Sequence, residues 1–298
     1  MGLPLAPILH ASGSGGAAVA GDPSPLRRVI PSSGQALPVI GMGTWITFNV
    51  GDDPEVIAQR TEVLRTFLQM GGGMVDSSPM YGSAEATLGR CLRTLGDDRG
   101  LFSATKVWTG SEDEGREQIA DSQRLWGIDY FDLFQVHNLL AWREHLPHLR
   151  DMKARGRLAH TGITTSHGRR HDDLERIMAR EELDFVQLTY NILDREPEQR
   201  LLPLARERGI AVIANRPFRR GGLIDALKGK PLPPWVEETG AASWPQFLLR
   251  FIVSHPAVTC AIPATSRVDH MRENMAAGRG VLPDAALRER MARYVREL

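Results

Sequence analysis

The sequence predicts an α/β fold, a (β/α)8 TIM barrel, on three observations. After residue 35 a short apolar run, a polar turn and an amphipathic helical segment follow one another repeatedly. Eight of the apolar runs are rich in Val, Ile, Leu or Phe, as strands covered on both faces should be. The chain has 298 residues, which suits a barrel of about 250 residues with additions. We therefore expect one barrel domain at residues 26–298, preceded by a separate segment at 1–25.

The expected strands are short and evenly distributed. They cover residues 39–43, 73–76, 101–106, 131–136, 160–164, 185–189, 210–214 and 258–262. Helices are expected between them, most clearly at 55–70, where apolar residues recur at helical spacing and Gly71 ends the segment. The segments 142–155 and 198–208 stop before Gly156 and Gly209 in the same way.

The alternative architecture is an open, doubly wound sheet. Such a sheet usually has a glycine-rich turn after its first strand. Here Gly41-Met42-Gly43 lacks the third glycine and opens no helix, which favours the closed barrel.

Two segments add to the barrel. Residues 28–40 predict a β-hairpin that turns at Ser33-Gly34, before the first barrel strand. Residues 215–242 form a long connection rich in Pro, Gly and Arg, and connections of that length usually serve a site. Its basic run Arg216, Arg219 and Arg220 is interpreted as a solvated loop unless it lies near a cofactor phosphate. Additional helices are expected at the C-terminus.

The composition gives no support to functions that require a strongly charged protein. The chain has 36 basic and 36 acidic residues, so nothing indicates nucleic acid or an anionic membrane as partner. No apolar stretch is long enough to span a bilayer. Cys91 and Cys260 match no metal or redox spacing and are expected to be buried thiols, and no metal site is expected. The oligomeric state stays open.

The N-terminal 25 residues leave two interpretations open. Residues 3–9 are apolar, and a stretch of small residues follows that contains Ala18-Val19-Ala20, which is similar to a signal-peptidase site. No basic region precedes the apolar run. The segment is either a disordered tail or a remnant export signal, so the location is either the cytoplasm or a bacterial periplasm.

Ionisable residues stand at the ends of three successive expected strands. Asp76, Lys106 and His137 end the second, third and fourth strands, and Tyr81 lies five residues after Asp76. Each alone has a structural explanation, as a turn, a surface charge, a packed histidine or a loop tyrosine. Together they match the place where barrels carry reactive side chains, because charged residues are rarely buried without a partner.

Carbonyl reduction gives this set of residues a chemical reason. Reduction needs a hydride and a proton, and the Tyr81 hydroxyl can donate the proton if its pKa of about 10 is brought nearer neutrality. A neighbouring Lys106 ammonium favours the phenolate. Asp76 would hold Lys106 in place, and a neutral His137 would donate a hydrogen bond to the carbonyl oxygen.

Three segments resemble the aldo-keto reductase family. The run from Asp76 to Glu85 is similar to that family's motif with an aspartate and a tyrosine five residues apart, followed by Gly and Glu. Residues 104–108 and 132–138 resemble its lysine and histidine strands, and the resemblance extends from about Gly41 to Asn274. It implies a catalytic tetrad of Asp76, Tyr81, Lys106 and His137 and the reduction of an aldehyde or ketone to an alcohol by a nicotinamide cofactor.

The resemblance also implies a set of cofactor residues, with departures. Thr164 and Thr165 replace a serine and an asparagine that hold the nicotinamide carboxamide, and Gln187 matches a glutamine at the same group. Asn215 replaces a tyrosine that stacks on the nicotinamide, a role in which Phe218 would help. The expected cofactor residues are Gly43, Thr44, Trp45, Thr164, Thr165, Gln187, Asn215, Arg216, Pro217, Phe218, Ile262, Ala264, Thr265, Ser266, Arg267, His270, Glu273 and Asn274.

The expected cofactor is NADP(H), with NAD(H) as the alternative. In many relatives a lysine and an arginine contact the 2′-phosphate, and here those positions are Ala264 and His270. Arg267 is the candidate that replaces them, since it supplies a fixed charge nearby. The substrate is expected to be a small carbonyl compound in a pocket lined by Trp45, Trp108 and Asn138.

Two other functions were weighed against this one. A cofactor-bound sensing module with slow turnover, similar to the potassium-channel β subunits of this fold, would keep the same residues. A barrel enzyme with unrelated chemistry, such as an isomerase, would leave the cofactor segments without a role. The chain is most similar to bacterial members with an Asn-Arg-Pro-Phe segment, many of which carry a twin-arginine export signal.

Overall fold

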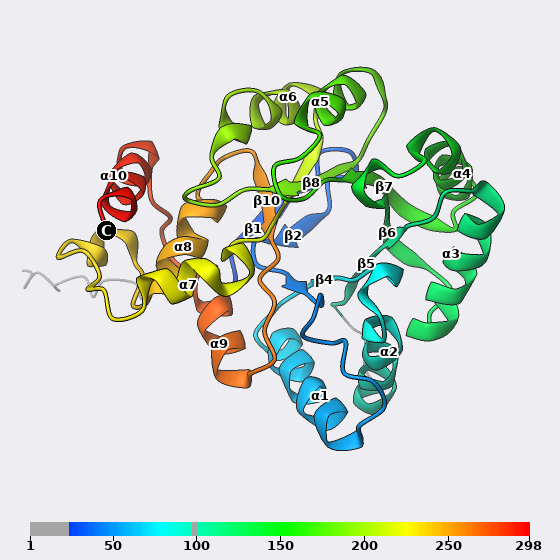
Figure 1. Cartoon of the computed structure of the whole chain (residues 1–298), viewed down its shortest axis with the longest axis horizontal. Coiled ribbons are helices and arrows are strands. Elements are labelled where there is room, and N and C mark those ends of the chain that lie inside the picture. The colour runs from blue at the N-terminus through cyan, green and yellow to red at the C-terminus, as the bar shows by residue number, and fades with distance from the viewer. Residues whose placement is uncertain (1–23, 97–99) are drawn as a thin grey trace, which may run out of the picture.

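The computed structural model describes residues 24–96 and 100–298, and a parallel sheet of eight strands forms its centre (Figure 1). The strands are β3 (Met42–Gly43), β4 (Met74–Asp76), β5 (Phe102–Val107), β6 (Phe131–Val136), β7 (Leu158–Thr164), β8 (Phe185–Thr189), β9 (Ala211–Asn215) and β10 (Val258–Ala261). Each pairs with the next in chain order. A parallel bridge from Ile40 to Ala261 joins the first strand to the last. The barrel prediction is confirmed, and the open sheet is excluded.

Seven expected strands lie within two residues of the observed ones, and the first, 39–43, was wrong in extent. Pairing with β4 begins only at Met42, opposite Val75. Before that point the chain bonds instead to β10, where Gly41 N donates to Ala261 O at 2.8 Å and Ala261 N donates to Val39 O at 2.9 Å. Residues 39–41 therefore close the barrel, and only two residues count as strand.

Helices cover the outside of the barrel, as βα repetition requires. They are α1 (Pro54–Gln69), α2 (Ala84–Leu95), α3 (Glu112–Trp126), α4 (Trp142–Ala154), α5 (His171–Arg180), α6 (Leu201–Arg208), α8 (Trp244–Val253) and α9 (Val268–Ala276). The expected helices 55–70 and 142–155 are confirmed as α1 and α4. The third, 198–208, starts later, at Leu201, because residues 196–198 form a separate 3-10 turn.

Helix α1 shows how local sequence sets these boundaries. The Asp53 carboxylate caps the helix by accepting from Glu55 N at 2.9 Å and Val56 N at 3.3 Å. Val63, Leu64 and Phe67 are completely buried against the barrel. Burial of one such side chain contributes about 1.5–3 kcal/mol.

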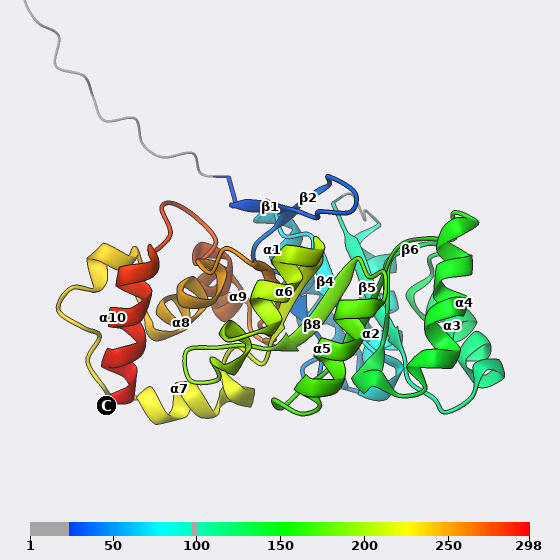
Figure 2. The same cartoon turned by 90° about the horizontal axis from the view of Figure 1, so that it is seen from above.

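The expected hairpin is confirmed and closes one end of the barrel. Strands β1 (Arg27–Val29) and β2 (Ala36–Pro38) pair antiparallel, and Gly34 takes the positive φ of 75° that their turn requires. Ile30 and Leu37 pack into the barrel interior with Met74 and Phe102. Figure 2 shows this hairpin at one end of the barrel and α7 at the opposite end. A cavity in the barrel must therefore open at the α7 end.

The connection at 215–242 was expected as a loop, and this was wrong in part. It contains helix α7 (Gly222–Leu227) and 3-10 turns at Arg219–Gly221 and Val236–Thr239. Leu223 and Leu227, four residues apart, are buried on one side of α7, which explains why a helix forms here. The expected C-terminal addition is α10 (Ala285–Arg296), whose buried Arg288 bonds to Glu198 at 2.9 Å.

Three smaller expectations concern the cysteines, the N-terminus and membrane spans. Cys91 and Cys260 are buried free thiols, as expected. Of the segment 1–25, residues 1–23 lie outside the described residues. In the described part of the chain, every helix is too short or too polar to cross a membrane.

Candidate active site

One cavity of about 770 Å³ lies at the carboxyl ends of the strands, the end opposite the hairpin. Asp76, Tyr81 and His137 line it, and Lys106 is completely buried beside them. A second hollow of about 540 Å³ lies on the outer surface at α1 and α2 and contains none of the expected site residues. The barrel therefore brings the four expected catalytic residues to one place.

Lys106 and Asp76 form a buried ion pair. Lys106 Nζ donates to Asp76 Oδ2 at 2.6 Å and to the backbone oxygen of Ser77 at 2.7 Å. Their side chains are 0% and 2% exposed. Burial alone lowers the pKa of Lys106, but the charges of Asp76 and Tyr81 outweigh it, and the pKa is raised. Lys106 therefore keeps its positive charge at neutral pH.

Two glutamines hold the other oxygen of Asp76. Asp76 Oδ1 accepts from Gln187 Nε2 at 2.9 Å and from Gln135 Nε2 at 3.2 Å. Gln135 was missed, although a signal existed: it is the polar residue two positions before His137 in an apolar strand, so both side chains point to the same face. Gln187, expected at the cofactor carboxamide, also has this second role. Together the glutamines fix the carboxylate that holds Lys106.

Tyr81 ends a 3-10 turn, Pro79–Tyr81, that brings its ring over Lys106. Lys106 Nζ lies 5.2 Å from the ring centroid. Burial raises the pKa of Tyr81, the Lys106 charge acts to lower it, and the net shift is upward. The lysine thus acts in the expected direction, but burial outweighs its charge, so the expected net lowering of the pKa is not found. The hydroxyl carries its proton at neutral pH, as a proton donor must.

His137 is held as a neutral ring. Its Nδ1 lies 2.8 Å from Ser78 Oγ, and its ring meets that of Tyr81 edge-on at 5.7 Å. Burial and the nearby Lys106 charge lower the pKa of His137 to about 2. Ser78 Oγ already accepts from Met80 N at 3.2 Å, which favours donation of its own proton to Nδ1. The second ring nitrogen, Nε2, then carries the hydrogen. Ser78 was missed as a site residue, and its position between Asp76 and Tyr81 in the sequence was the only signal.

Comparison with known proteins identifies the family. A sequence model described as the aldo/keto reductase family matches residues 39–290. The chain belongs to this family. It is therefore an NAD(P)H-dependent oxidoreductase of the aldo-keto reductase class.

Relatives of this aldo-keto reductase are similar along most of their length. Methylglyoxal reductase YeaE of Escherichia coli K12 is 26% identical over 256 residues, which cover 84% of this chain and 89% of the relative. The NADH-specific methylglyoxal reductase of the same strain is 27% identical over 231 residues, or 65% and 68% of the two chains. A Klebsiella pneumoniae aldo/keto reductase in complex with NADP and acetate superimposes with a TM-score of 0.75 at 24% identity, over 90% of this chain and 94% of that one.

Most cofactor residues expected for this reductase line the cavity. They are Gly43, Thr44, Trp45, Thr164, Thr165, Gln187, Asn215, Arg216, Pro217, Phe218, Ile262, Ala264, Thr265, His270, Glu273 and Asn274. Ser266 and Arg267 are not among the lining residues. The Arg267 guanidinium instead pairs with the carboxylate of Asp269, with Nε 3.0 Å from Oδ1.

Asn215 lies where the resemblance to the family predicts an aromatic residue, and its contacts are polar. It is buried, its Oδ1 accepts from Thr189 Oγ1 at 2.8 Å, and its Nδ2 donates to the backbone oxygen of Thr165 at 2.9 Å. Asn215 therefore ties β9 to the ends of β7 and β8. Phe218, half-buried in the cavity wall, is the aromatic ring on this loop.

Two of the three residues expected in the substrate pocket line the cavity. Trp45 and Asn138 line the cavity, but Trp108 does not, and its expected place in the pocket wall was wrong for this structure. The amide of Gln118 on α3 holds the Trp108 backbone, accepting from Trp108 N at 2.5 Å, and the side chain is 41% exposed. Met80, Ile46 and Ile224 are apolar lining residues that the sequence did not indicate.

Proposed function

We propose that this aldo-keto reductase uses NADP(H) to reduce an aldehyde or ketone to an alcohol, with Tyr81 as the general acid. The observation that supports this proposal most directly is the buried Lys106–Asp76 pair. It lies beside the Tyr81 ring and a neutral His137, and three of these four side chains face one cavity. A barrel with unrelated chemistry would leave this arrangement without a purpose.

The residues expected to hold the cofactor fit it in one specific respect. Thr165 Oγ1 is buried at the cavity, and within the described residues it has no hydrogen-bond partner. Buried polar atoms are normally satisfied, so an orphaned hydroxyl at the expected carboxamide position suits a ligand amide. The bound cofactor supplies a hydride from the nicotinamide C4.

The protein side chains then handle the charge and the proton. The neutral His137 donates from Nε2 to the substrate carbonyl oxygen, which gains negative charge as hydride adds to the carbon. Tyr81 donates its hydroxyl proton to that oxygen. Lys106, fixed by Asp76 and Ser77, stabilises the phenolate that remains.

The names of relatives support a small carbonyl substrate and are compatible with either NADP(H) or NAD(H) as the cofactor. Two relatives are named methylglyoxal reductases, and one of these is named NADH-specific. Two solved relatives are described as complexes with NADP or NADPH. We infer NADP(H) as the main cofactor, with NAD(H) as the alternative.

A single-turnover measurement tests the proposal against a slow sensing module. The protein is loaded with NADPH and mixed with excess methylglyoxal or benzaldehyde, and the loss of absorbance at 340 nm is followed. We expect oxidation of the bound cofactor within seconds and multiple turnovers when NADPH is in excess. Oxidation that takes hours, with tight cofactor binding, would instead favour a sensing role.

A further inference from the structure

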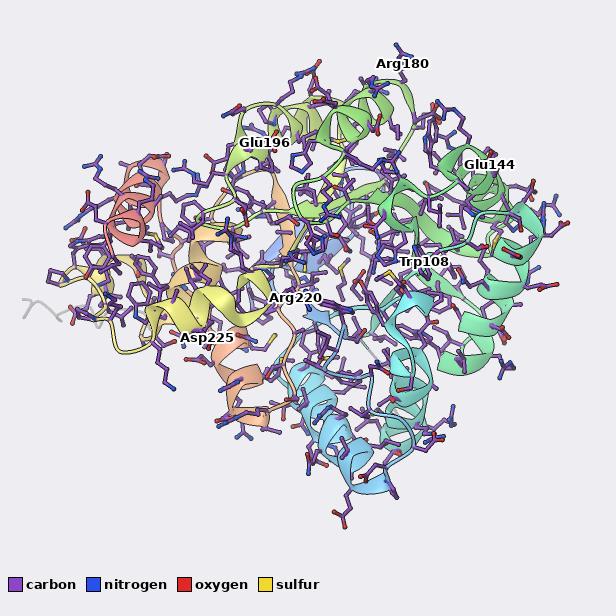
Figure 3. The ribbon with its side chains drawn as sticks, in the orientation of Figure 1. Trp108, Glu144, Arg180, Glu196, Arg220 and Asp225 are labelled. Atoms are coloured by element: carbon purple, nitrogen blue, oxygen red, sulfur yellow. The ribbon has the colours of Figure 1, made fainter. Side chains whose placement is uncertain are left out.

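The loops after β7 and β9 bring five basic side chains to the cavity, and one of them, Arg170, pairs with Asp173. The other four are His167, Arg169, Arg216 and Arg220, hereafter the basic cluster. From the sequence, Arg216 and Arg220 were interpreted as part of a solvated loop unless near a cofactor phosphate, and Arg216 was also expected among the cofactor residues. His167 and Arg169 were not expected at the site. Figure 3 places Arg220 near the centre of the barrel, seen from the α7 end.

The contacts of the basic cluster leave its positive charge without a carboxylate. Arg216 Nη1 contacts His167 Nε2, and the Arg220 guanidinium lies 4.4 Å over the Trp45 ring. Within residues 24–96 and 100–298, no hydrogen bond or ion pair holds the Arg169 side chain.

Neighbouring arginines on the same loops are paired. Arg170 Nε donates to Asp173 at 3.0 Å, and Arg219 Nε donates to Asp194 at 2.8 Å. Asp173 therefore neutralises Arg170, which also lines the cavity, and Asp194 neutralises Arg219, which does not. Within the described residues, Arg169, Arg216 and Arg220 have no carboxylate in an ion pair.

The charges of the basic cluster repel one another. Burial and then the charge of Arg220 lower the pKa of Arg216 most; Asp194 acts to raise it, Arg219 and Arg169 lower it further, and the net shift is downward. Burial, Arg216, Arg169 and Arg220 lower the pKa of His167 in the same manner. Asp225 and Glu273 also line the cavity, on α7 and α9. Like charges gathered at a cavity favour an anion as the missing partner.

The backbone holds these side chains in an unusual conformation. His167, Arg216 and Arg220 have φ values of 65°, 54° and 63°, which residues other than glycine rarely adopt. Side chains from β8 and the loop after it fix two of them: Thr189 Oγ1 accepts from His167 N at 3.0 Å, and Asn191 Nδ2 donates to Arg216 O at 3.1 Å. Such conformations persist where the surroundings enforce them, often at ligand sites.

The basic cluster lies on the loops after β7 and β9, whereas the expected adenosine residues follow β10. The strand order is β10-β9-β8-β7, and α9, with its expected adenosine residues, follows β10. A cofactor with its nicotinamide at Thr165 and Gln187 would extend past β9 and β10 toward α9. Arg216, just after β9, contacts His167 in the loop after β7, away from α9 in the strand order.

We propose that the basic cluster is an anion subsite that binds a carboxylate or phosphate group carried by the carbonyl substrate. This inference rests on the proposed function. Guanidinium groups recognise such oxyanions through paired N–H donors. Met80 and Ile46, 37% and 55% exposed, line the same cavity from the loops after β4 and β3 and would contact the apolar body of the substrate.

A matched pair of substrates tests the subsite. We compare kcat/KM for 4-carboxybenzaldehyde and benzaldehyde in the wild type, Arg169→Gln and Arg216→Gln. The ratio of the two values cancels any effect on the cofactor, because both reactions use the same loaded enzyme. We expect the wild type to prefer the carboxylate and each variant to lower the ratio about tenfold, the effect of one charge-assisted hydrogen bond. Arg219→Gln is the control: it removes the same charge from a guanidinium bound to Asp194 and should leave the ratio unchanged.

The other outcomes overturn the proposal. An unchanged ratio in both variants means that the cluster does not contact the substrate anion, and an equal fall in the control means that only the overall charge matters. A weaker Kd for NADPH with an unchanged ratio assigns the cluster to the cofactor. A binding measurement tests the subsite even if the proposed function is wrong. If the wild type reduces neither aldehyde, calorimetry still compares the Kd of benzoate with that of benzyl alcohol. Benzoate that binds no better than benzyl alcohol contradicts it.

Discussion

Lys106 Nζ lies 2.6 Å from Asp76 Oδ2, and neither side chain reaches solvent appreciably. A buried ion pair of this kind contributes little to stability compared with apolar residues, because desolvation offsets the attraction. Its retention in the barrel interior is therefore best explained by its effect on Tyr81. Gln135 and Gln187 complete the arrangement by holding the second oxygen of Asp76.

Tyr81→Phe should remove the proton donor and keep the ring. We expect kcat for carbonyl reduction to fall by about 10²–10⁴-fold, the usual contribution of a general acid. The Kd for NADPH, measured by fluorescence, should stay within about twofold, since the change removes one hydroxyl. Wild-type kcat in the variant, under conditions where hydride transfer limits turnover, would disprove the assignment.

Lys106→Met and Asp76→Asn should each slow the reaction, and their effects should not add. Both changes act on the same phenolate, so the double variant should resemble the slower single variant. Each single change should also lower the free energy of unfolding by about 3–5 kcal/mol, because it leaves one buried group without its partner. Urea unfolding and single-turnover rates in the double-mutant cycle measure both effects. Additive losses in rate would show that the two residues act independently.

The pH dependence of stability should carry the signature of His137. Its pKa is about 2 in the folded chain and near the ordinary 6.5 when unfolded. Below pH 6.5 the unfolded chain binds a proton at His137 that the folded chain does not. The contribution of the neutral His137 to the free energy of unfolding is therefore complete above pH 6.5 and is lost as the pH falls. The loss is about 1.4 kcal/mol per pH unit. Urea unfolding at pH 7.5 and 5.5 should show a loss about 1.4 kcal/mol smaller in His137→Asn. Equal losses in both proteins would mean that His137 titrates normally.

Arg267 is predicted to contact the 2′-phosphate of NADPH after leaving Asp269. Both side chains are 61% exposed, so the ion pair is screened by water and costs little to break. One charge-assisted contact gives a preference for NADPH over NADH of about 10- to 100-fold. Arg267→Ala should lower that ratio of Kd values, and Arg272→Ala, in the helix that Arg267 precedes, is the control. An unchanged ratio in Arg267→Ala would exclude this residue, and a wild type that prefers NADH would exclude the NADP(H) assignment.

The features that could be predicted from the sequence are those that depend on the spacing of apolar residues and on which residues end the strands. Two-sided burial makes each barrel strand an apolar run, and strands that end at one face of the barrel place Asp76, Lys106 and His137 together. The same alternation would have placed Gln135 beside His137 had it been applied to polar residues.

The features that could not be predicted depend on contacts between loops that are far apart in the sequence. Arg216 reaches His167 across 49 positions of sequence, and no local pattern indicates that contact. Trp108 is a residue that the sequence placed in the pocket and the loop conformation does not. It follows a barrel strand, as a pocket residue would, but Gln118 holds its backbone and the side chain does not line the cavity. The cofactor roles of Thr164 and Asn215 are predicted from family resemblance and not from a local pattern.

The β1–β2 hairpin has a consequence for the order of events in turnover. Since Ile30 and Leu37 fill the opposite end of the barrel, cofactor and substrate must share the opening at the strand ends. The nicotinamide would rest on Thr165 and Gln187, deeper than any compound that touches Met80 or Ile46. The partner that sits deeper has to arrive first and depart last. A compound that lingers in the outer part of the cavity would therefore trap the spent cofactor beneath it and set the pace of the whole cycle.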